Sequence, residues 1–183
     1  MHMHKDVERI LLTREQIDDK VRCIARQLDN DYKSTVPVLL CILNGAVVFL
    51  TDLMRQMETD VEIDFMQASS YGDKTTSNGS IEILKDASVD LKGRDVIVVE
   101  DIADTCVTLR SLLEKLKEYG PKSIKLCVFL NKLDVRAPKD DIMIDYKGFD
   151  IPNEFVIGYG LDYANKYRDL PYVGILKKSV YEK

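Results

Sequence analysis

The chain has 183 residues, 45% of them hydrophobic and 31% charged, and a formal net charge of −5 at pH 7. This balance is typical of a soluble globular protein, and the length suits one domain with one core. The acidic balance argues against a nucleic-acid partner, whose phosphates require a basic surface. It still allows a phosphorylated small molecule in a local basic or metal-filled pocket.

No apolar run approaches the roughly 20 residues that span a bilayer, and the opening MHMHKDVERI lacks the apolar segment of a signal peptide. We therefore expect no membrane partner and a cytoplasmic location. None of the four cysteines belongs to a CxxC pair, which disfavours a zinc site and a disulfide framework. Cys23, Cys41 and Cys127 lie in apolar stretches and are expected in the core. His2 and His4 lie at a terminus that is expected to fray, so no catalytic role is assigned to them.

The first helix is expected to begin at Thr13, because Gln16 three residues later can complete a capping box. Its apolar face would consist of Ile17, Val21, Ile24, Ala25 and Leu28. The nearly continuous apolar run at residues 36–43 predicts a strand that is covered on both sides. Asn44 and Gly45 after it are a turn signal.

A second helical stripe is formed by Leu50, Leu53, Met54 and Met57. Residues 61–65 alternate Val61, Ile63 and Phe65 with acidic side chains, which predicts a strand with one buried face. Residues 69–80, reading SSYGDKTTSNGS, have no apolar period. A polar loop of this length in a compact domain is usually functional or mobile, and residues 81–84 are expected to form a short strand after it.

The centre of the chain predicts a strand at residues 95–99, a helix whose face carries Leu109, Leu112, Leu113 and Leu116, and a strand at residues 124–130. Gly120 and Pro121 end the helix. A strand, helix and strand in this order form a βαβ unit with a right-handed crossover, which implies a parallel sheet and an α/β fold. Two more short strands are expected at residues 142–144 and 155–159. With no linker or repeat, residues 1–183 are expected to form a single domain.

Residues 100–108 lie where the central strand meets its helix, and ligands of open parallel sheets bind beyond the carboxyl ends of strands. The free N–H groups and positive dipole end of a helix start suit a phosphate, and the hydroxyls of Thr105 and Thr108 can add donors. The carboxylates of Glu100 and Asp101 repel phosphate but accept hydrogen bonds from sugar hydroxyls. A ribose 5-phosphate satisfies both halves, with Mg²⁺ offsetting further negative charge.

A purely structural interpretation of the same residues stays open, since acidic residues at strand ends are often only solvated and Thr residues commonly cap helices. Other phosphate motifs are missing: the chain has neither GxGxxG nor GxxxxGK[ST]. That weakens a dinucleotide or ATP function.

The segment VVEDIADTCVTL at residues 98–109 resembles the phosphoribosyl-pyrophosphate motif of the type I phosphoribosyltransferases. Four further features resemble the hypoxanthine-guanine branch of that family, in the same order along the chain. They are LNGAVVF at 43–49, SSYG at 69–72, Lys132, and FVIGYGLDYANKYRDLPYVGIL at 155–176. The resemblance covers residues 10–180. It implies a Rossmann-like, mostly parallel twisted sheet with flanking helices and a small hood.

The resemblance also implies roles for particular residues around phosphoribosyl pyrophosphate. Glu100 and Asp101 would hold the ribose hydroxyls, and the 5-phosphate would lie against Thr105, Cys106, Val107 and Thr108. Asp104 would border the ribose site and act catalytically, handling the proton at N7 of the purine. Leu43, Asn44 and Gly45 would form the pyrophosphate loop, with Arg168 contacting pyrophosphate. Ser70 and Tyr71 would belong to a mobile loop that closes over the reaction.

On the purine side, the resemblance implies that Lys132 donates to O6, Phe155 stacks on the base, and Val156, Leu161 and Asp162 complete the pocket. Glu100, Asp101 and Asp162 would take part in holding Mg²⁺. Structural alternatives stay open here: Lys132 as a surface lysine, Phe155 as core packing, Asp162 as a cap or as the partner of Lys166 on a helix, and Arg168 paired with Asp169.

Two residues depart from the family pattern. Cys106 stands where the family usually has Gly, which suits unusual backbone angles and close approach to phosphate. A thiol at a helix start can also be reactive. Asn44 stands where some relatives carry Lys, which removes one positive charge from the pyrophosphate loop.

The implied activity is purine salvage: the 5-phosphoribosyl group of phosphoribosyl pyrophosphate moves to N9 of hypoxanthine, and of guanine, giving IMP or GMP. The expected assembly is a homodimer or homotetramer. A xanthine-preferring enzyme is the main competitor within the class. From other classes, we weigh a nucleotide-sensing RNA-binding regulator, which the low basic content disfavours. We also weigh a flavodoxin-like domain that accepts a phosphoryl group. Such a domain would need its acidic pair near the first strand, whereas the acidic pair of this chain lies at residues 100 and 101.

Overall fold

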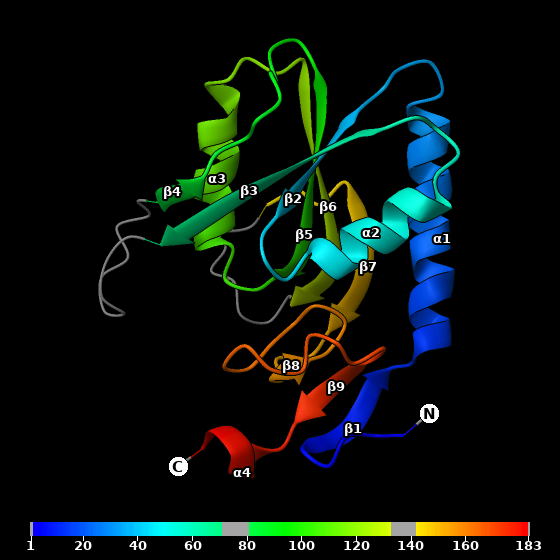
Figure 1. Cartoon of the computed structure of the whole chain (residues 1–183), viewed down its shortest axis with the longest axis vertical. Helices are drawn as coiled ribbons and strands as arrows, with labels where there is room; N and C mark the ends of the chain where they lie inside the picture. The colour runs from blue at the N-terminus through cyan, green and yellow to red at the C-terminus, as the bar shows by residue number, and fades with distance from the viewer. Residues whose placement is uncertain (1, 71–80, 133–141, 183) are drawn as a thin grey trace.

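The computed structural model of this chain describes residues 2–70, 81–132 and 142–182. Its larger sheet has six strands in the order β4-β3-β2-β5-β6-β7 (Figure 1). These are β2 (Val38–Ile42), β3 (Glu62–Ser70), β4 (Ile81–Lys85), β5 (Asp95–Ala103), β6 (Ser123–Lys132) and β7 (Tyr146–Ile151). All neighbours pair in parallel except β4, which is antiparallel to β3. The expected mostly parallel α/β sheet is therefore confirmed.

Helices cover both faces of this sheet (Figure 1). The core on one face packs α1 (Arg14–Asp31) and α2 (Val47–Gln56) against alternate strand residues such as Leu39 and Val99. The core on the other face packs α3 (Val107–Lys117) against the residues between them, such as Leu40 and Val98. Because both faces are buried, the central strands have the unbroken apolar sequences that predicted them.

The first helix begins where its sequence indicates. The Gln16 amide N–H donates to Thr13 Oγ1 over 3.3 Å, and the Thr13 amide N–H donates to Gln16 Oε1 over 2.8 Å. Every residue of its expected apolar face is buried. Cys23 is exposed, however, so the prediction of a core thiol there was wrong. It lies between residues of the buried stripe in sequence but points off that face of the helix. Cys41 and Cys127 are buried as expected.

A second, three-stranded sheet has the order β1-β9-β8 and is formed by β1 (Val7–Leu12), β9 (Val173–Leu176) and β8 (Val156–Ile157). It lies at the end of the larger sheet toward which β5, β6 and β7 point (Figure 1). The short α4 (Lys178–Tyr181) follows β9. This sheet corresponds to the expected hood. No helix of the described residues is both long enough and apolar enough to cross a membrane.

Strand boundaries near the hood differ from the sequence expectation. No strand forms at 142–144; the strand of that region is β7, which begins at Tyr146. The strand expected at residues 155–159 is reduced to Val156 and Ile157. The chain turns immediately afterwards, because Gly158 and Tyr159 both have positive φ values. β1 and β9 come from opposite ends of the chain, and neither was predicted.

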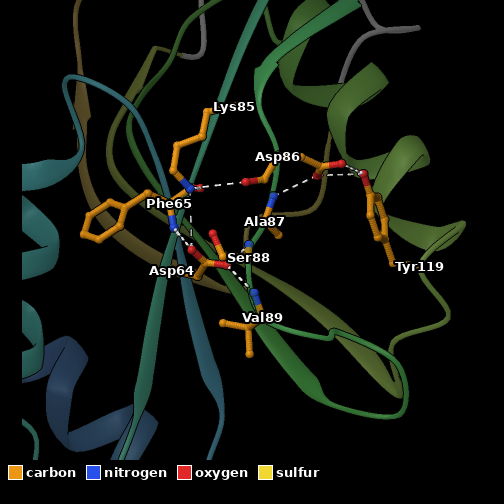
Figure 2. A network of polar contacts seen from close by, with 8 residues as sticks. All are labelled: Asp64, Phe65, Lys85, Asp86, Ala87, Ser88, Val89 and Tyr119. Carbon is orange, nitrogen blue, oxygen red and sulfur yellow. Dashed lines mark hydrogen bonds and ion pairs between the residues drawn. The ribbon is translucent and has the colours of Figure 1, made fainter.

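The buried face of β3 carries a carboxylate. Asp64 is only 5% exposed and Met66 is fully buried, whereas Ile63 is 40% exposed. The Asp64 side chain accepts hydrogen bonds from the amide N–H groups of Phe65, Ser88 and Val89 over 2.5–2.9 Å (Figure 2). It also lies 3.7 Å from Lys85 Nζ. The Asp64 carboxylate therefore fastens the segment after β4 onto β3, which hydrophobic alternation alone does not reveal.

Replacing Asp64 by Ala is expected to lower the free energy of unfolding by about 1–3 kcal/mol, the cost of leaving buried N–H groups unpaired. Burial alone would raise the pKa of Asp64, but the N–H donations from Val89, Phe65 and Ser88 outweigh it, so the pKa lies below its ordinary value. The stabilisation is thus present above the ordinary carboxyl pKa of about 4 and is lost as the pH falls through the lowered value.

Urea unfolding of the wild type and of Asp64→Ala at pH 7 and at pH 2–3 measures this difference. Asp86→Ala is the matched control, since Asp86 is exposed and accepts from the Tyr119 hydroxyl in the same network (Figure 2). A difference of the same size at both pH values would contradict the assignment.

Candidate active site

The end of β5 and the start of α3 enclose the first of two neighbouring cavities. Its volume is about 270 Å³, and its lining includes Glu100, Asp104, Thr105, Cys106 and Thr108. α3 begins at Val107, so its free N–H groups are at this end of the helix. Leu43 and Ala68 from the neighbouring strand ends complete the wall. Glu100, Asp104 and the helix start therefore border one cavity, whereas Asp101 lines the second one.

Cys106 adopts the left-handed backbone conformation, with φ 62° and ψ 4°. This is the region that favours glycine, so the turn keeps the shape that a glycine would give it although the residue has a side chain. The thiol is buried among the residues of α3 and the sheet and donates to the Asp104 carbonyl oxygen at 3.6 Å. The Cys106 side chain is only 5% exposed, so its thiol is packed in the core rather than accessible to reagents.

The second cavity, of about 310 Å³, adjoins the first. It is lined by Asp101, Ile102, Asp104, Lys132, Phe155, Val156, Leu161 and Asp162. The five residues predicted to surround a purine are therefore all brought together, from β6, β8 and the turn after it. Ile102 and Asp104 line both cavities. Ile102 is a wall residue that sequence reasoning missed; its signal was the alternation of β5, which places it on the same face as Glu100.

Lys132 ends β6 and is only 8% exposed. Its Nζ lies 3.3 Å from Asp104 Oδ2, an ion pair between the two sides of the second cavity. The Asp104 side chain is 48% exposed, so the pair has one buried and one accessible member. A surface lysine is thus excluded for position 132: its charge is held at the cavity wall.

Glu100 and Asp101 form an unusual acidic pair at the base of the two cavities. Burial and the neighbouring Asp101 charge raise the pKa of Glu100 well above its usual value. Burial also raises the pKa of Asp101, although the Glu100 side chain, the Ile102 N–H and the Arg168 guanidinium act in the opposite direction. Two adjacent carboxylates in this state favour binding of a positive charge or of hydroxyl donors.

The loop after β2 packs against this acidic pair. The Leu43–Asn44 peptide bond is cis. A Cβ atom at position 45 would overlap the Asp101 carboxylate, so Gly45 allows the loop to approach the acid directly. Leu43 lines the first cavity, and the Asn44 side chain is exposed. The predicted pyrophosphate loop and the predicted ribose acids are therefore in contact.

Arg168 and Asp162 pair with each other. Arg168 Nη2 lies 2.8 Å from Asp162 Oδ1, and Nη1 donates to the Gly160 carbonyl oxygen over 2.6 Å. Residues 162–168 form bridges and turns, so the alternative of an Asp162–Lys166 pair along a helix is wrong. The Asp162 carboxylate also accepts from the Asn165 N–H.

The three acids expected to take part in holding Mg²⁺ do not form one cluster. Across the described residues 2–70, 81–132 and 142–182, no group of three or more His, Cys, Asp or Glu side chains is placed to hold a metal ion. Glu100 and Asp101 adjoin each other, whereas Asp162 is taken up by Arg168. Of the predicted mobile loop, Ser70 ends β3 and Tyr71 lies outside the described residues.

In open parallel α/β sheets, ligands bind beyond the carboxyl ends of the strands, which is where the diacid, the start of α3 and the two cavities lie. Comparison with known proteins shows the family. The family model described as the phosphoribosyl transferase domain matches residues 10–164. The chain belongs to the phosphoribosyltransferase family.

Several similar proteins and solved structures carry hypoxanthine phosphoribosyltransferase names. The chain is 43% identical over 180 residues to the hypoxanthine-guanine phosphoribosyltransferase of Bacillus subtilis, covering 98% of this chain and 99% of that protein. It is 44% identical over 179 residues to the bifunctional protein TilS/HprT of Listeria monocytogenes, matching 27% of that longer protein. A crystal structure of a hypoxanthine phosphoribosyltransferase from Staphylococcus aureus superposes with a TM-score of 0.94 at 41% identity, covering 99% of this chain and 97% of that one.

Proposed function

We propose that this chain transfers the 5-phosphoribosyl group from phosphoribosyl pyrophosphate to N9 of hypoxanthine or guanine, giving IMP or GMP and pyrophosphate. The observation that carries the proposal is the pair of cavities that share Asp104: one has acids and a helix start, and the other has Lys132 and Phe155. A nucleotide has the same division into a sugar phosphate and a flat base.

In the first cavity, the 5-phosphate lies on the N–H groups and hydroxyls from Thr105 to Thr108, because a helix start offers unpaired donors and a positive dipole end. The left-handed Cys106 supports this assignment, since it gives the turn the shape of a glycine-containing phosphate loop. The ribose hydroxyls donate to Glu100 and Asp101. Arg168 contacts the pyrophosphate. Its positive charge acts on Asp101, where it lowers the pKa of the carboxyl group against the effect of burial.

The acidic pair also fits a divalent cation. Mg²⁺ usually keeps several waters and is held by one or two carboxylates together with substrate oxygens, so a cluster of three protein ligands is not required. Glu100 and Asp101 would supply those two carboxylates, since they are adjacent and each lines one of the two cavities. When bound, the ion neutralises the pyrophosphate leaving group. Asp162 would act on the pyrophosphate indirectly, because its carboxylate pairs with the Arg168 guanidinium.

The reaction breaks the bond between C1′ and a pyrophosphate oxygen and forms the bond between C1′ and N9. A purine protonated at N7 must lose that proton as N9 attacks. Asp104 borders both cavities and accepts it, and the Lys132 ammonium lies 3.3 Å from the carboxylate oxygen Oδ2. Pyrophosphate leaves with the electron pair of the broken bond.

Base choice follows from the polarity of the second cavity. Lys132 is a donor without an acceptor and fits a 6-oxo group rather than the 6-amino group of adenine. Hypoxanthine, guanine and xanthine all carry that oxygen. We propose hypoxanthine and guanine as the substrates, with xanthine as the competitor that a direct assay decides, and a homodimer or homotetramer as the assembly.

The assay mixes purified protein, phosphoribosyl pyrophosphate and MgCl₂ with hypoxanthine, guanine, xanthine or adenine, and measures nucleotide by chromatography and pyrophosphate by an enzyme-coupled signal. IMP and GMP are expected with one pyrophosphate each, with no AMP, and chelation of Mg²⁺ is expected to stop both. Absence of nucleotide with every 6-oxopurine would contradict the proposal. RNA binding that weakens with salt, without pyrophosphate release, would instead support a regulator.

A further inference from the structure

The ring of Phe155 is held by two other aromatic rings. Tyr181 stacks on one face, with ring centroids 5.0 Å apart and planes inclined by 24°. Tyr163 meets it edge to face at 5.5 Å and 86°. Phe155 is nevertheless 38% exposed and lines the second cavity, whereas Tyr181 is not part of the lining. One face of the ring is therefore backed by Tyr181, and the surface left open borders the cavity.

The chain segment that carries Tyr181 is fastened to the hood. The Phe155 carbonyl oxygen accepts from the Leu176 N–H over 2.9 Å, so the end of β9 fixes the Phe155 backbone. The next residue, Lys177, donates its N–H to the Asp6 carbonyl over 2.9 Å. Val180 and Tyr181 then pack on the small core beneath the hood sheet. The backbone and the ring of Phe155 are thus held by the same short stretch of chain.

We propose that Tyr181 is a positioning residue for the purine: it holds the Phe155 ring parallel to the base, so that base, Phe155 and Tyr181 form a three-ring stack. The inference rests on the proposed function. An exposed phenylalanine loses rotamer freedom when a ligand stacks on it, and a ring that is already fixed loses less. Offset-stacked aromatic pairs also gain energy beyond the area that they bury.

This arrangement affects binding of the base and leaves the sugar phosphate site alone. Neither Phe155 nor Tyr181 lines the first cavity. Asp104 directly follows β5 and Lys132 ends β6, and both strands belong to the other sheet. Removing the Tyr181 ring is therefore expected to raise KM for hypoxanthine while kcat and KM for phosphoribosyl pyrophosphate stay unchanged. A residue that merely stabilised the fold would affect all of these quantities together.

The experiment compares Tyr181→Ala, Tyr181→Leu and Tyr181→Phe in steady-state kinetics, alone and in a Phe155→Leu background. Tyr181→Ala is expected to raise KM for hypoxanthine about two- to tenfold, the size of one aromatic pair. Tyr181→Leu, which keeps apolar volume without a ring, is expected to match it, and Tyr181→Phe to restore the wild-type value. Lys178→Ala is the control, since Lys178 is exposed on the same helix and, within the part of the chain that the structure describes, pairs with Glu182.

In the Phe155→Leu background, Tyr181→Ala is expected to have no further effect, because the ring it supports is gone. An unchanged KM for hypoxanthine in Tyr181→Ala would overturn the inference. So would an equal rise in the Phe155→Leu background, or a loss of kcat together with a lower unfolding midpoint or an altered oligomeric mass. If the wild-type protein made no nucleotide, that result would contradict the proposed function, and the inference that rests on it would fail as well.

Discussion

Replacing Asp104 by Asn is expected to lower kcat by about 10²–10⁴-fold, the usual contribution of a general acid–base group. Asn has nearly the same shape but cannot take up the N7 proton of the purine. The carboxylate borders both cavities and lies 3.3 Å from Lys132 Nζ, so a change confined to its charge acts at the reacting base. KM for phosphoribosyl pyrophosphate is expected to change much less.

The fold is expected to survive this substitution. The Asp104 side chain is about half exposed, and the amide oxygen of the substitute can still accept a hydrogen bond from the buried Lys132 ammonium, so we expect a loss of at most about 1–3 kcal/mol. Urea unfolding of Asp104→Asn checks that point. Asp19→Asn is a matched control, because Asp19 is exposed on α1 and, among the described residues, pairs with Arg22. Turnover of Asp104→Asn within threefold of the wild type would remove Asp104 from the chemistry.

Replacing Gly45 by Ala is expected to lower kcat/KM for phosphoribosyl pyrophosphate by about 100-fold or more, since a misplacement of about 1 Å can cost that much. The new methyl group would occupy the position of the Asp101 carboxylate, so either the loop or the acid must move. Both are proposed to contact the substrate, one at pyrophosphate and the other at ribose. Stability is expected to fall by about 1–3 kcal/mol, as for other overpacked sites.

Gly93→Ala is the control for a generic glycine effect. Gly93 has φ +71°, so alanine there costs about 1–2 kcal/mol of backbone strain, but nothing lies within 4 Å of the added carbon. Its activity is expected to match the wild type. A crystal structure of Gly45→Ala with Asp101 in its original position, or activity within threefold of the wild type, would contradict the steric argument.

Sequence alone predicts the parts of this fold that depend on local patterns. The capping box at Thr13, the five-residue apolar face of α1, and the strand–helix–strand unit around residues 95–130 were all confirmed. Their signals lie within one helix turn or one strand. Burial on both sides of a parallel strand also leaves a clear signal, because every position is then apolar.

Features that depend on contacts distant in sequence were not predicted. Asp64 faces the interior because amide N–H groups more than twenty residues away complete its hydrogen bonds. β1 exists only as the partner of β9, from the other end of the chain. Arg168 reaches Asp162 because the backbone reverses between them, at residues with positive φ that the sequence does not mark with glycine.

For the site, the motif placed the acids and the helix start correctly, but it did not reveal how they meet the purine side. That junction depends on the shared wall of Asp104 and Ile102, which forms only when β5 and the hood come together. Cys106 stands where the family usually has glycine, and the structure keeps the left-handed conformation at this position.

A crystal structure of the chain with IMP and Mg²⁺ shows directly whether the sugar phosphate lies in the first cavity and the base in the second. We expect the phosphate against the N–H groups of residues 105–108, the ribose hydroxyls within hydrogen-bond reach of Glu100 and Asp101, and hypoxanthine between Lys132 and the Phe155 ring. Nucleotide density away from both cavities, or IMP bound with its base in the first cavity and its phosphate beside Phe155, would contradict it.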